Sequence, residues 1–273
     1  MTALAAGPAP ESFLSGKVGH VGRRRAPLLR AADALLDLQL RLRGVPRRLD
    51  EMAAEVPRRR VLAASAFRPD STRIAAVESE LRRSGHEVRL AFGSTEDHGG
   101  GKFQNLNAIL AEADGGEQDW LLLVDDDVVL PPRFLDRLLG VCERFELRLA
   151  QPALTLASHG AWDVTRRRSG RLARETRFVE IGPVTVLARD AAAELVPFPD
   201  LRFGWGLDLH WAAVGRERGW RLGVVDALPV RHDLAGVASA YPHAQAVAEA
   251  QRFLRERDYL PASEAGQTLR DLR

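Results

Sequence analysis

Residues 119–132 read Asp-Trp-Leu-Leu-Leu-Val-Asp-Asp-Asp-Val-Val-Leu-Pro-Pro. The apolar run from Trp120 to Val124 is short and continuous, which is typical of a strand buried on both faces of a sheet. Three acids follow it at once, and Pro131 and Pro132 then favour the first turn of a helix. The stretch therefore predicts a buried strand that ends in carboxylates and leads into a helix.

The three acids are Asp125, Asp126 and Asp127. In open α/β sheets, ligands bind at the carboxyl ends of the strands. Adjacent carboxylates repel one another, so we expect a positive partner that offsets the repulsion. A divalent metal carrying a phosphorylated ligand is the obvious candidate. The alternative is a solvated acidic turn, but the apolar strand before the acids and the helix after them favour a ligand site.

The composition is that of a soluble globular protein. With 45% hydrophobic and 28% charged residues in 273, the chain can bury the core of one domain with an extension. A net charge of +2 gives no indication of nucleic acid binding. The single cysteine, Cys142, excludes an internal disulfide and is expected in the core. Without an apolar run of membrane-spanning length or a signal-peptide pattern, we expect a cytoplasmic protein. Its basic charge is almost all arginine, which is typical of a GC-rich bacterial genome.

Residues 60–235 predict the globular domain, in which strands alternate with helices. Expected strands cover 61–67, 86–92, 120–124, 147–154, 178–187 and 221–225. Expected helices cover about 71–84, 103–113, 132–145 and the stretch from 207. This alternation predicts an α/β fold with a mostly parallel central sheet flanked by helices.

The two ends of the chain are expected to lie outside this domain. Residues 1–59 predict a basic helical extension, and residues 236–273 predict a C-terminal helix and a polar tail. Within the extension, one apolar stripe comprises Leu28, Leu29, Ala32, Leu35 and Leu36. We expect this helix to pack on the flank of the domain. The alternative is contact with the anionic inner face of a membrane, although the stripe has no aromatic residue.

At this point the sequence resembles the GT-A fold glycosyltransferases, nearest to the large family 2-like group, over roughly residues 60–235. The central likeness is the Asp-x-Asp motif after a buried strand, here Asp125-Asp126-Asp127. The resemblance implies that Asp125 meets the nucleotide ribose and the metal, and that Asp127 binds the metal on the diphosphate. Asp126 would serve either purpose.

Two further stretches are similar to the nucleotide-sugar-binding part of that family. Gly-Ser-Thr-Glu-Asp, which contains Ser94 and Asp97, resembles its Asp-Gly-Ser-x-Asp loop, although Phe92 stands where the first acid is usual. Lys102 followed by Asn107 resembles its Gly-Lys-x-x-x-x-Asn helix start. A lysine at a helix N-terminus can approach a diphosphate. The glycines before it, taken alone, predict only a flexible loop.

Gly204-Trp205-Gly206-Leu207-Asp208 resembles the Gly-Trp-Gly-x-acid stretch of galactosyltransferase-type enzymes. The resemblance implies that Gly206 lets the backbone approach the sugar, that Trp205 lines the acceptor side of the donor site, and that Asp208 is the catalytic base. Leu209 stands where the family often has a second acid, so Asp208 would act alone. We expect the dipole of the following helix to keep Asp208 ionised. The alternative is a glycine turn with an aspartate that caps the helix.

His232 follows the last predicted strand, where related enzymes place a metal ligand. An imidazole beside carboxylates favours Mn²⁺, with Mg²⁺ as the alternative. The other possibility is a loop histidine near Asp226 or Asp233, whereas His210 is expected to be structural. Residues 158–177 are rich in arginine and predict a solvated loop or a site for an anionic acceptor. Trp162 would stack on a sugar or anchor this loop.

These features together predict a metal-dependent, inverting glycosyltransferase, and a hexosyltransferase in particular. Its partners would be a nucleotide-diphospho-sugar donor and a hydroxyl acceptor, with an anionic or lipid-linked acceptor as one option. The alternatives are a sugar-phosphate nucleotidyltransferase and a non-catalytic nucleotide-sugar-binding protein. The residues after the first strand, Ala64 to Arg68, do not match the glycine-rich signature of nucleotidyltransferases.

Overall fold

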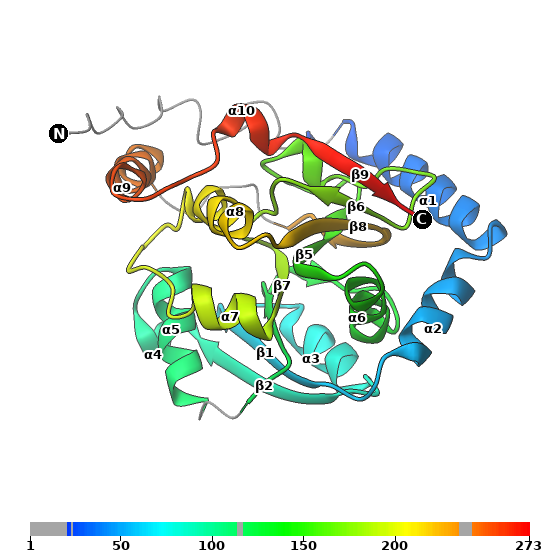
Figure 1. Ribbon diagram of the computed structural model, residues 1–273, viewed down its shortest axis with the longest axis horizontal. Helices are drawn as coiled ribbons and strands as arrows, with labels where there is room; N and C mark the ends of the chain where they lie inside the picture. The colour runs from blue at the N-terminus through cyan, green and yellow to red at the C-terminus, as the bar shows by residue number, and fades with distance from the viewer. Residues whose placement is uncertain (1–20, 23, 114–116, 235–241) are drawn as a thin grey trace.

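The computed structural model describes residues 21–22, 24–113, 117–234 and 242–273 (Figure 1). Its strands are β1 (Arg60–Phe67), β2 (Glu87–Ser94), β3 (Trp120–Val124), β4 (Val128–Val129), β5 (Leu147–Leu154), β6 (Ala173–Thr176), β7 (Val184–Ala188), β8 (Arg221–His232) and β9 (Thr268–Leu272). Its α-helices are α1 (Ala26–Leu42), α2 (Val45–Glu55), α3 (Ile74–Arg82), α4 (Thr95–His98), α5 (Lys102–Glu112), α6 (Phe134–Arg144), α7 (Arg189–Leu195), α8 (Leu207–Glu217), α9 (His243–Arg255) and α10 (Ala262–Ala265).

The strands form one sheet in the order β2-β1-β3-β7-β5-β8-β6-β9, and β4 pairs with β8 beside this path. β1 is parallel to both β2 and β3, and β5 is parallel to β8. β7 is antiparallel to β3 and β5, and β6 is antiparallel to β8 and β9. Along the path only β6 and β7 therefore oppose the common direction. The predicted α/β fold with a mostly parallel sheet flanked by helices is confirmed.

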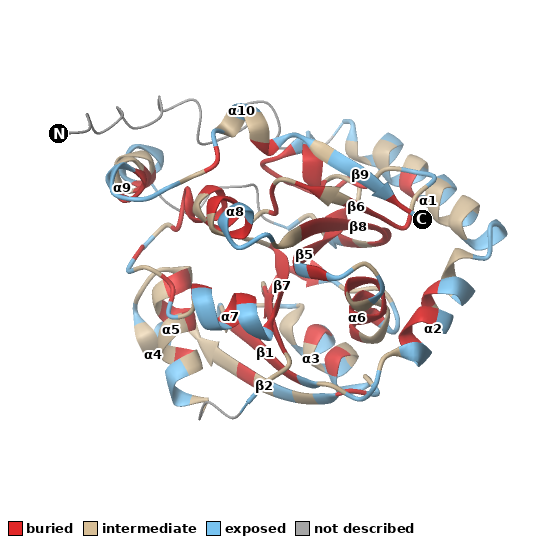
Figure 2. Ribbon diagram, viewed as in Figure 1, coloured by how far each residue is buried: buried red, intermediate tan, exposed pale blue. Residues whose placement is uncertain are grey.

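The central strand β3 separates two hydrophobic cores, as its continuous apolar run predicted. Leu121 and Leu123 face the cluster that contains α5, α7, α8 and α9. Trp120 and Leu122 face the cluster that contains α2, α3 and α6. Figure 2 shows buried residues along the strands at the centre of the molecule. Successive residues of a strand point to opposite faces, so both faces of β3 are covered.

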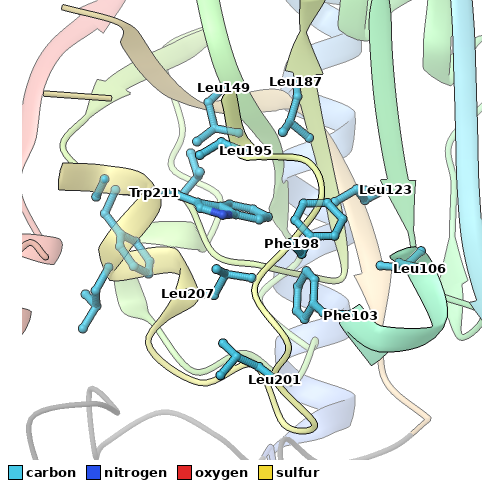
Figure 3. Packing of buried hydrophobic residues seen from close by; sticks show 14 of the residues in the cluster. Phe103, Leu106, Leu123, Leu149, Leu187, Leu195, Phe198, Leu201, Leu207 and Trp211 are labelled. Carbon is cyan, nitrogen blue, oxygen red and sulfur yellow. The ribbon is translucent and has the colours of Figure 1, made fainter. Parts of the chain in front are cut away.

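An aromatic group fixes the starts of two helices that carry expected site residues. Phe103 of α5 packs edge-on against two rings (Figure 3). Its ring centroid lies 5.2 Å from that of Phe198, which follows α7, and 6.1 Å from that of Trp211 in α8. Phe103 and Trp211 have no exposed surface. Because Phe103 follows Lys102 directly and Trp211 lies three residues after Asp208, this contact holds the starts of α5 and α8 beside each other.

The segments on either side of residues 60–235 contribute to the same cores and sheet. Leu49 and Met52 of α2 belong to the cluster beneath α6, and Asp50 accepts a 2.7 Å hydrogen bond from Nε of Arg137. A Cβ on Gly140 would lie 2.8 Å from the backbone nitrogen of Ala53, so α2 and α6 pack closely at this glycine. At the other end of the chain, β9 pairs with β6. Among the described helices, none is long and apolar enough to cross a membrane.

The elements that the sequence analysis missed are short. The stretch expected as a strand over 178–187 pairs only over Val184–Ala188, and α7 follows it directly. The strand expected over 221–225 continues to His232 as β8, because β4 pairs with Arg231 and His232. The polar tail contains β9, and the loop after Gly93 contains the one-turn helix α4.

The arginine-rich segment is not a solvated loop, and this expectation was wrong. Arg174 is fully buried and donates from Nε to Asp226 at 2.7 Å. Arg167 is also buried and pairs with Asp33 and Asp37 of α1. Trp162 packs on Phe178 in the core, with ring centroids 4.8 Å apart. Arginines of residues 158–177 thus bind acids and carbonyls of the protein itself, and Trp162 anchors this segment in the core.

Candidate active site

The candidate site gathers at the carboxyl end of β3, where the fold brings positive groups to each of the three aspartates. Asp125 continues from β3 and its backbone nitrogen donates to the carbonyl of Pro183 at 2.8 Å. This bond places residues 180–183, just before β7, beside the acids. The sequence analysis expected a positive partner, and the structure supplies protein side chains for it.

Asp125 is paired with Lys102 at the start of α5. The Nζ atom of Lys102 lies 2.7 Å from Oδ1 of Asp125 and donates to the carbonyl of Ile181 at 3.0 Å. A Cβ on Gly182 would lie 2.8 Å from this Nζ and 3.0 Å from Oδ2 of Asp125, so a side chain there would displace the pair. Burial raises the pKa of Asp125, and the charge of Lys102 opposes that rise. Lys102 therefore lies beside the acids, and its part in donor binding stays a prediction.

Asp126 holds the loop after β1. Its Oδ2 accepts from the backbone nitrogen of Arg68 at 2.8 Å and from Nε at 3.1 Å, and its Oδ1 accepts from the guanidinium at 3.0 Å. Its carbonyl accepts from the hydroxyl of Ser71 at 2.8 Å. Asp126 thereby positions Arg68, whose guanidinium also lies 3.7 Å from Asp127. Sequence reasoning missed Arg68, because 58 residues separate it from Asp126.

Asp127 faces His232, as the expected metal-ligand pair requires. Nε2 of His232 lies 3.2 Å from Oδ2, to which it is hydrogen-bonded, and 3.1 Å from Oδ1. Oδ1 of Asp127 is buried and has no well-aligned hydrogen bond. The pairing of Val128 in β4 with His232 in β8 creates this contact. His232 thus ends a strand beside the acids and is not a loop residue near Asp226.

Burial and neighbouring charges shift the pKa values of Asp127 and His232 in opposite directions. Burial alone would raise the pKa of Asp127, but the hydrogen bond and charge of His232, with Arg68 and Lys102, lower it below its ordinary value. Burial alone would lower the pKa of His232, but Asp127 and Asp125 raise it. The two groups therefore stabilise each other as an ion pair.

Asp208 lies in the first turn of α8 and is only 6% exposed. Its Oδ1 accepts from the backbone nitrogen of Leu209 at 2.9 Å, while Gly206 occupies the N-cap position. Burial first, and then the charge of Glu180, raise the pKa of Asp208 to about 8. The expectation that the helix dipole keeps Asp208 ionised was wrong, because desolvation exceeds the effect of the helix N-terminus.

Glu180 is a site residue that the sequence analysis missed. Burial raises its pKa to about 7, against the hydrogen bonds that it accepts from the backbone nitrogen of Ala161 and from the hydroxyl of Thr165, both at 3.3 Å. The charges of His232 and Lys102 also act on it. A carboxylate directly before Ile-Gly-Pro in an apolar stretch was the available signal. Asp208 therefore has an acidic neighbour from another element, although Leu209 follows it in the sequence.

The Phe-Gly-Trp-Gly turn before α8 is held from two sides. Gly204 and Gly206 both have positive φ values, +75° and +83°. Glu249 of α9 accepts from the backbone nitrogens of residues 202, 203 and 204 at 2.8, 2.8 and 3.2 Å. Trp205 is buried and packs edge-on against His243, with ring centroids 4.9 Å apart. Trp205 and Gly206 thus shape the turn that presents Asp208.

The remaining expected donor-binding residues lie around α4 and α5. Ser94 caps α4 by accepting from the backbone nitrogen of Glu96 at 3.2 Å, and Asp97 is exposed on that helix. Asn107 donates to the carbonyl of Phe198 at 2.7 Å and accepts from its nitrogen at 2.8 Å. Both polar atoms of the Asn107 amide contact the protein's own backbone, so these contacts do not support its expected part in donor binding. His210 contacts the carbonyl of Asp258 and is structural, as expected.

Two side chains of the candidate site suit a divalent metal. Within the described ranges, no group of three or more His, Cys, Asp and Glu side chains forms a metal-binding cluster. Asp127 and His232 nevertheless fit as a carboxylate and an imidazole ligand, because they are adjacent and Oδ1 of Asp127 has acceptor capacity. Asp125 is a weaker candidate, since Lys102 neutralises it.

No protein-family model matches the sequence, and no curated protein matches it. Among solved structures, the chain is similar to a mannosyltransferase from Pyrobaculum calidifontis solved with GDP-Man and Mn²⁺, at 14% identity and a TM-score of 0.48 over 88% of this chain and 78% of that one. It is similar to S. aureus TarS residues 1–349 solved with UDP-GlcNAc, at 10% identity and a TM-score of 0.44 over 67% of this chain and 62% of that one. It is also similar to a mycobacterial protein, at 15% identity and a TM-score of 0.46 over 76% of this chain and 77% of that one. These scores are low, and the ligands are those of the neighbours.

Proposed function

We propose that the chain is a glycosyltransferase of the GT-A, family 2-like type that moves a hexose from a nucleotide-diphospho-sugar to an acceptor hydroxyl. One observation carries this proposal. The pairs Lys102–Asp125 and Asp127–His232 gather at the carboxyl end of β3, within the electrostatic range of Glu180, which in turn acts on Asp208. Cationic groups for a diphosphate thus lie close to carboxyl groups that can accept a proton.

The donor would bind between the end of β3 and the starts of α4 and α5. Lys102 would turn its ammonium to the diphosphate while staying within reach of Asp125. Ser94 and Asp97 would contact the nucleotide, and Asp126 would act indirectly by holding Arg68 near the phosphates. These assignments follow the resemblance in the sequence and the positions of the side chains.

Asp127 and His232 would hold a divalent metal, for which Mn²⁺ suits the imidazole ligand better than Mg²⁺. Such an ion, when bound, supplies positive charge to the leaving diphosphate. The protein's own cations share this task, since Lys102 and Arg68 already lie beside the acids. Arg68 would also limit the repulsion between neighbouring carboxylates.

Asp208 would act as the general base on the acceptor. In a single displacement, the acceptor oxygen bonds to the anomeric carbon as the bond to the diphosphate oxygen breaks, and the hydroxyl proton passes to Asp208. The nucleoside diphosphate leaves, and the anomeric configuration is inverted. Glu180 would raise the affinity of Asp208 for this proton, because a second carboxylate nearby disfavours the ionised form.

The raised pKa of Asp208 also favours one rival, a non-catalytic nucleotide-sugar-binding protein. A base that is protonated near neutral pH works slowly there. Binding and turnover distinguish the two, since the rival binds a donor without ever releasing its nucleoside diphosphate.

Donor binding can be tested by thermal unfolding with UDP- and GDP-sugars in the presence and absence of Mn²⁺. A true donor at about a hundredfold its Kd should stabilise the fold by about 2.7 kcal/mol. Asp127→Ala should abolish this stabilisation and leave the ligand-free fold intact, because Asp127 serves the site. His232→Ala should weaken Mn²⁺ binding in calorimetry by at least about tenfold.

The matched control is Asp190→Ala on α7, an aspartate whose side chain is 52% exposed. It lies at the opposite end of β3 from these pairs, because Ala188 just before it pairs with Trp120. It should keep the wild-type response. Failure of every nucleotide-sugar to stabilise the wild type would contradict the proposed function. Undiminished donor turnover in excess chelator would contradict only the part of the proposed function that concerns the metal.

A further inference from the structure

Helix α1 exposes a continuous row of leucines on the surface of the protein. Leu28, Leu35, Leu38 and Leu42 are 74, 68, 50 and 80% exposed. With the exposed Ala31, they occupy one face at helical spacing, and we name this set the leucine stripe. Figure 2 shows exposed positions along α1 at the edge of the molecule. At 1.5 Å per residue the 17-residue helix is about 25 Å long, so the stripe is an extended surface.

The opposite face of α1 is fastened to the protein by its acids. Asp33 accepts from the backbone nitrogens of Leu156 and Ala157 at 2.9 and 3.0 Å. Arg167 pairs with Asp33 at 3.3 Å and with Asp37 at 2.7 Å. Asp33 therefore points inward, and Asp37, whose side chain is 48% exposed, is held by Arg167. The outward part of α1 carries leucine, alanine and arginine, and its charge is positive.

A basic cavity adjoins the C-terminal end of α1. It has a volume of about 200 Å³ and includes Arg43, Arg48, Arg171 and Arg273 in its lining. Among the described residues that line it, there is no acid. Nε of Arg171 is buried and has no hydrogen-bond partner, although its guanidinium also pairs with Asp271 at 2.8 Å. Gln39 and Leu40 of α1 also line the cavity, and Arg43 directly follows Leu42, so the cavity adjoins the helix at the end where the leucine stripe finishes.

We propose that the leucine stripe and this arginine-lined cavity form a docking surface for an anionic lipid bilayer. The leucines would enter the boundary between headgroups and acyl chains, and a phosphate-bearing headgroup would occupy the cavity. Arginine suits phosphate oxygens because its guanidinium donates in a bidentate fork. The surface would bind in the plane of the membrane without crossing it.

Charge argues against a second copy of the chain as the occupant. Two leucine stripes packed together would bring the flanking Arg41 and Arg43 of each copy into proximity. The aspartates of α1 that could pair with them are already used by Arg167 and the backbone. An anionic bilayer instead meets the apolar stripe with acyl chains and the arginines with phosphates.

The start of α1 lies beside the candidate site. Arg30 pairs with Asp233, the residue after His232, at 3.2 Å. The backbone nitrogen of Val21 donates to Nδ1 of His159 at 3.1 Å, and the carbonyl of His159 lies 3.2 Å from Nδ1 of His232. Docking would therefore hold the site near the bilayer. That a lipid-linked acceptor benefits rests on the proposed function, whereas docking itself does not.

Co-sedimentation of the full chain with vesicles tests the proposal. Binding to vesicles that mix phosphatidylcholine with phosphatidylglycerol should exceed binding to phosphatidylcholine alone by at least about tenfold, and salt should weaken it. Leu35→Glu and Leu42→Glu should each reduce binding by at least about tenfold, because burying a leucine contributes more than that factor. Both side chains are exposed, so the variants should keep the wild-type melting temperature.

Two further variants separate the parts of the surface. Leu269→Glu on β9 is the matched control, since Leu269 is 50% exposed outside α1, and it should bind as the wild type does. Arg43→Gln with Arg48→Gln should reduce the preference for phosphatidylglycerol. Equal binding by Leu35→Glu, or equal binding to both vesicle types, would overturn the proposal. So would a dimer in ultracentrifugation that Leu35→Glu disperses. Asp208→Asn should bind vesicles normally, so failure of the proposed chemistry would leave this result unaffected.

Discussion

At the scale of single residues, Asp208 and Glu180 are a coupled pair of carboxyl groups. The pKa of Asp208 is raised to about 8 and that of Glu180 to about 7, in both cases mainly by burial. The groups acting on Glu180 include His232, Lys102, Thr165 and the backbone of Ala161, whereas Glu180 is the charged group acting on Asp208. Removal of the first proton therefore makes removal of the second harder.

This coupling predicts how turnover depends on pH. A general base must be deprotonated, so kcat should rise from about pH 6 to about pH 9. Glu180→Gln removes the like charge, lowers the pKa of Asp208 and should shift this rise toward lower pH. The measurement is the pH–rate profile of both proteins. If the profile of Glu180→Gln superimposes on that of the wild type, Glu180 does not act on the base.

At the scale of elements, the glycines before α5 and within the turn before α8 fix how two site segments meet. A Cβ on Gly101 would lie 1.7 Å from the carbonyl oxygen of Arg202, which leaves no space for any side chain. Taken alone, Gly99 to Gly101 predicted only a flexible loop. Their tight contact with the turn before α8 could not be seen in the sequence, because Gly101 and Arg202 lie 101 residues apart in the chain (202 minus 101).

Gly101→Ala should therefore destabilise the protein by about 1–3 kcal/mol, since backbone must shift to relieve the clash. It should also impair turnover, because Lys102 and the turn that presents Asp208 both move. Gly85→Ala is the matched control, since a Cβ there meets nothing within 4 Å. Chemical denaturation of the two variants measures the difference. Equal stability would show that the contact with Arg202 is not needed.

The sequence could predict elements that have a strong local pattern. The apolar runs of β1, β3 and β5 and the periodic helices α3, α5 and α8 lie where expected. β6 and β9 were not predicted, because they are short and polar. They are strands because β6 pairs with both β8 and β9. In the site, the motifs indicated Lys102, Asp127 and His232. Arg68 belongs to no local motif, and a carboxylate in an apolar stretch was the only local signal for Glu180, so the tertiary fold was needed to bring both to the site.

At the scale of the whole molecule, buried acids make stability depend on pH. The ordinary pKa of Asp208 is 3.8 and that of Glu180 is 4.5, and folding raises them to about 8 and about 7. Between these values the unfolded chain binds fewer protons than the folded one, so the free energy of unfolding falls as pH rises. The contribution of these two groups is fully present below about pH 4 and is lost as pH rises through about 7 to 8.

We therefore expect the melting temperature to decline between about pH 5 and about pH 8 from these groups. The double variant Glu180→Gln with Asp208→Asn should flatten this decline and be more stable than the wild type at alkaline pH. Each pKa unit corresponds to about 1.4 kcal/mol, so the two shifts together limit the gain to about 9 kcal/mol. Calorimetric scans of both proteins across this range measure it. A decline as steep in the double variant would mean that these carboxyl groups are not desolvated.

Sugar transfer with Asp208 as the base is best tested by the release of nucleoside diphosphate from nucleotide-sugars. Release is measured for the wild type and for Asp208→Asn, with donor affinity measured on the same samples. We expect release by the wild type, a loss by a factor of about 10² to 10⁴ in Asp208→Asn, and nearly equal donor affinity. Release by Asp208→Asn at the wild-type rate would contradict this mechanism, as would a wild type that binds a donor and never releases the diphosphate.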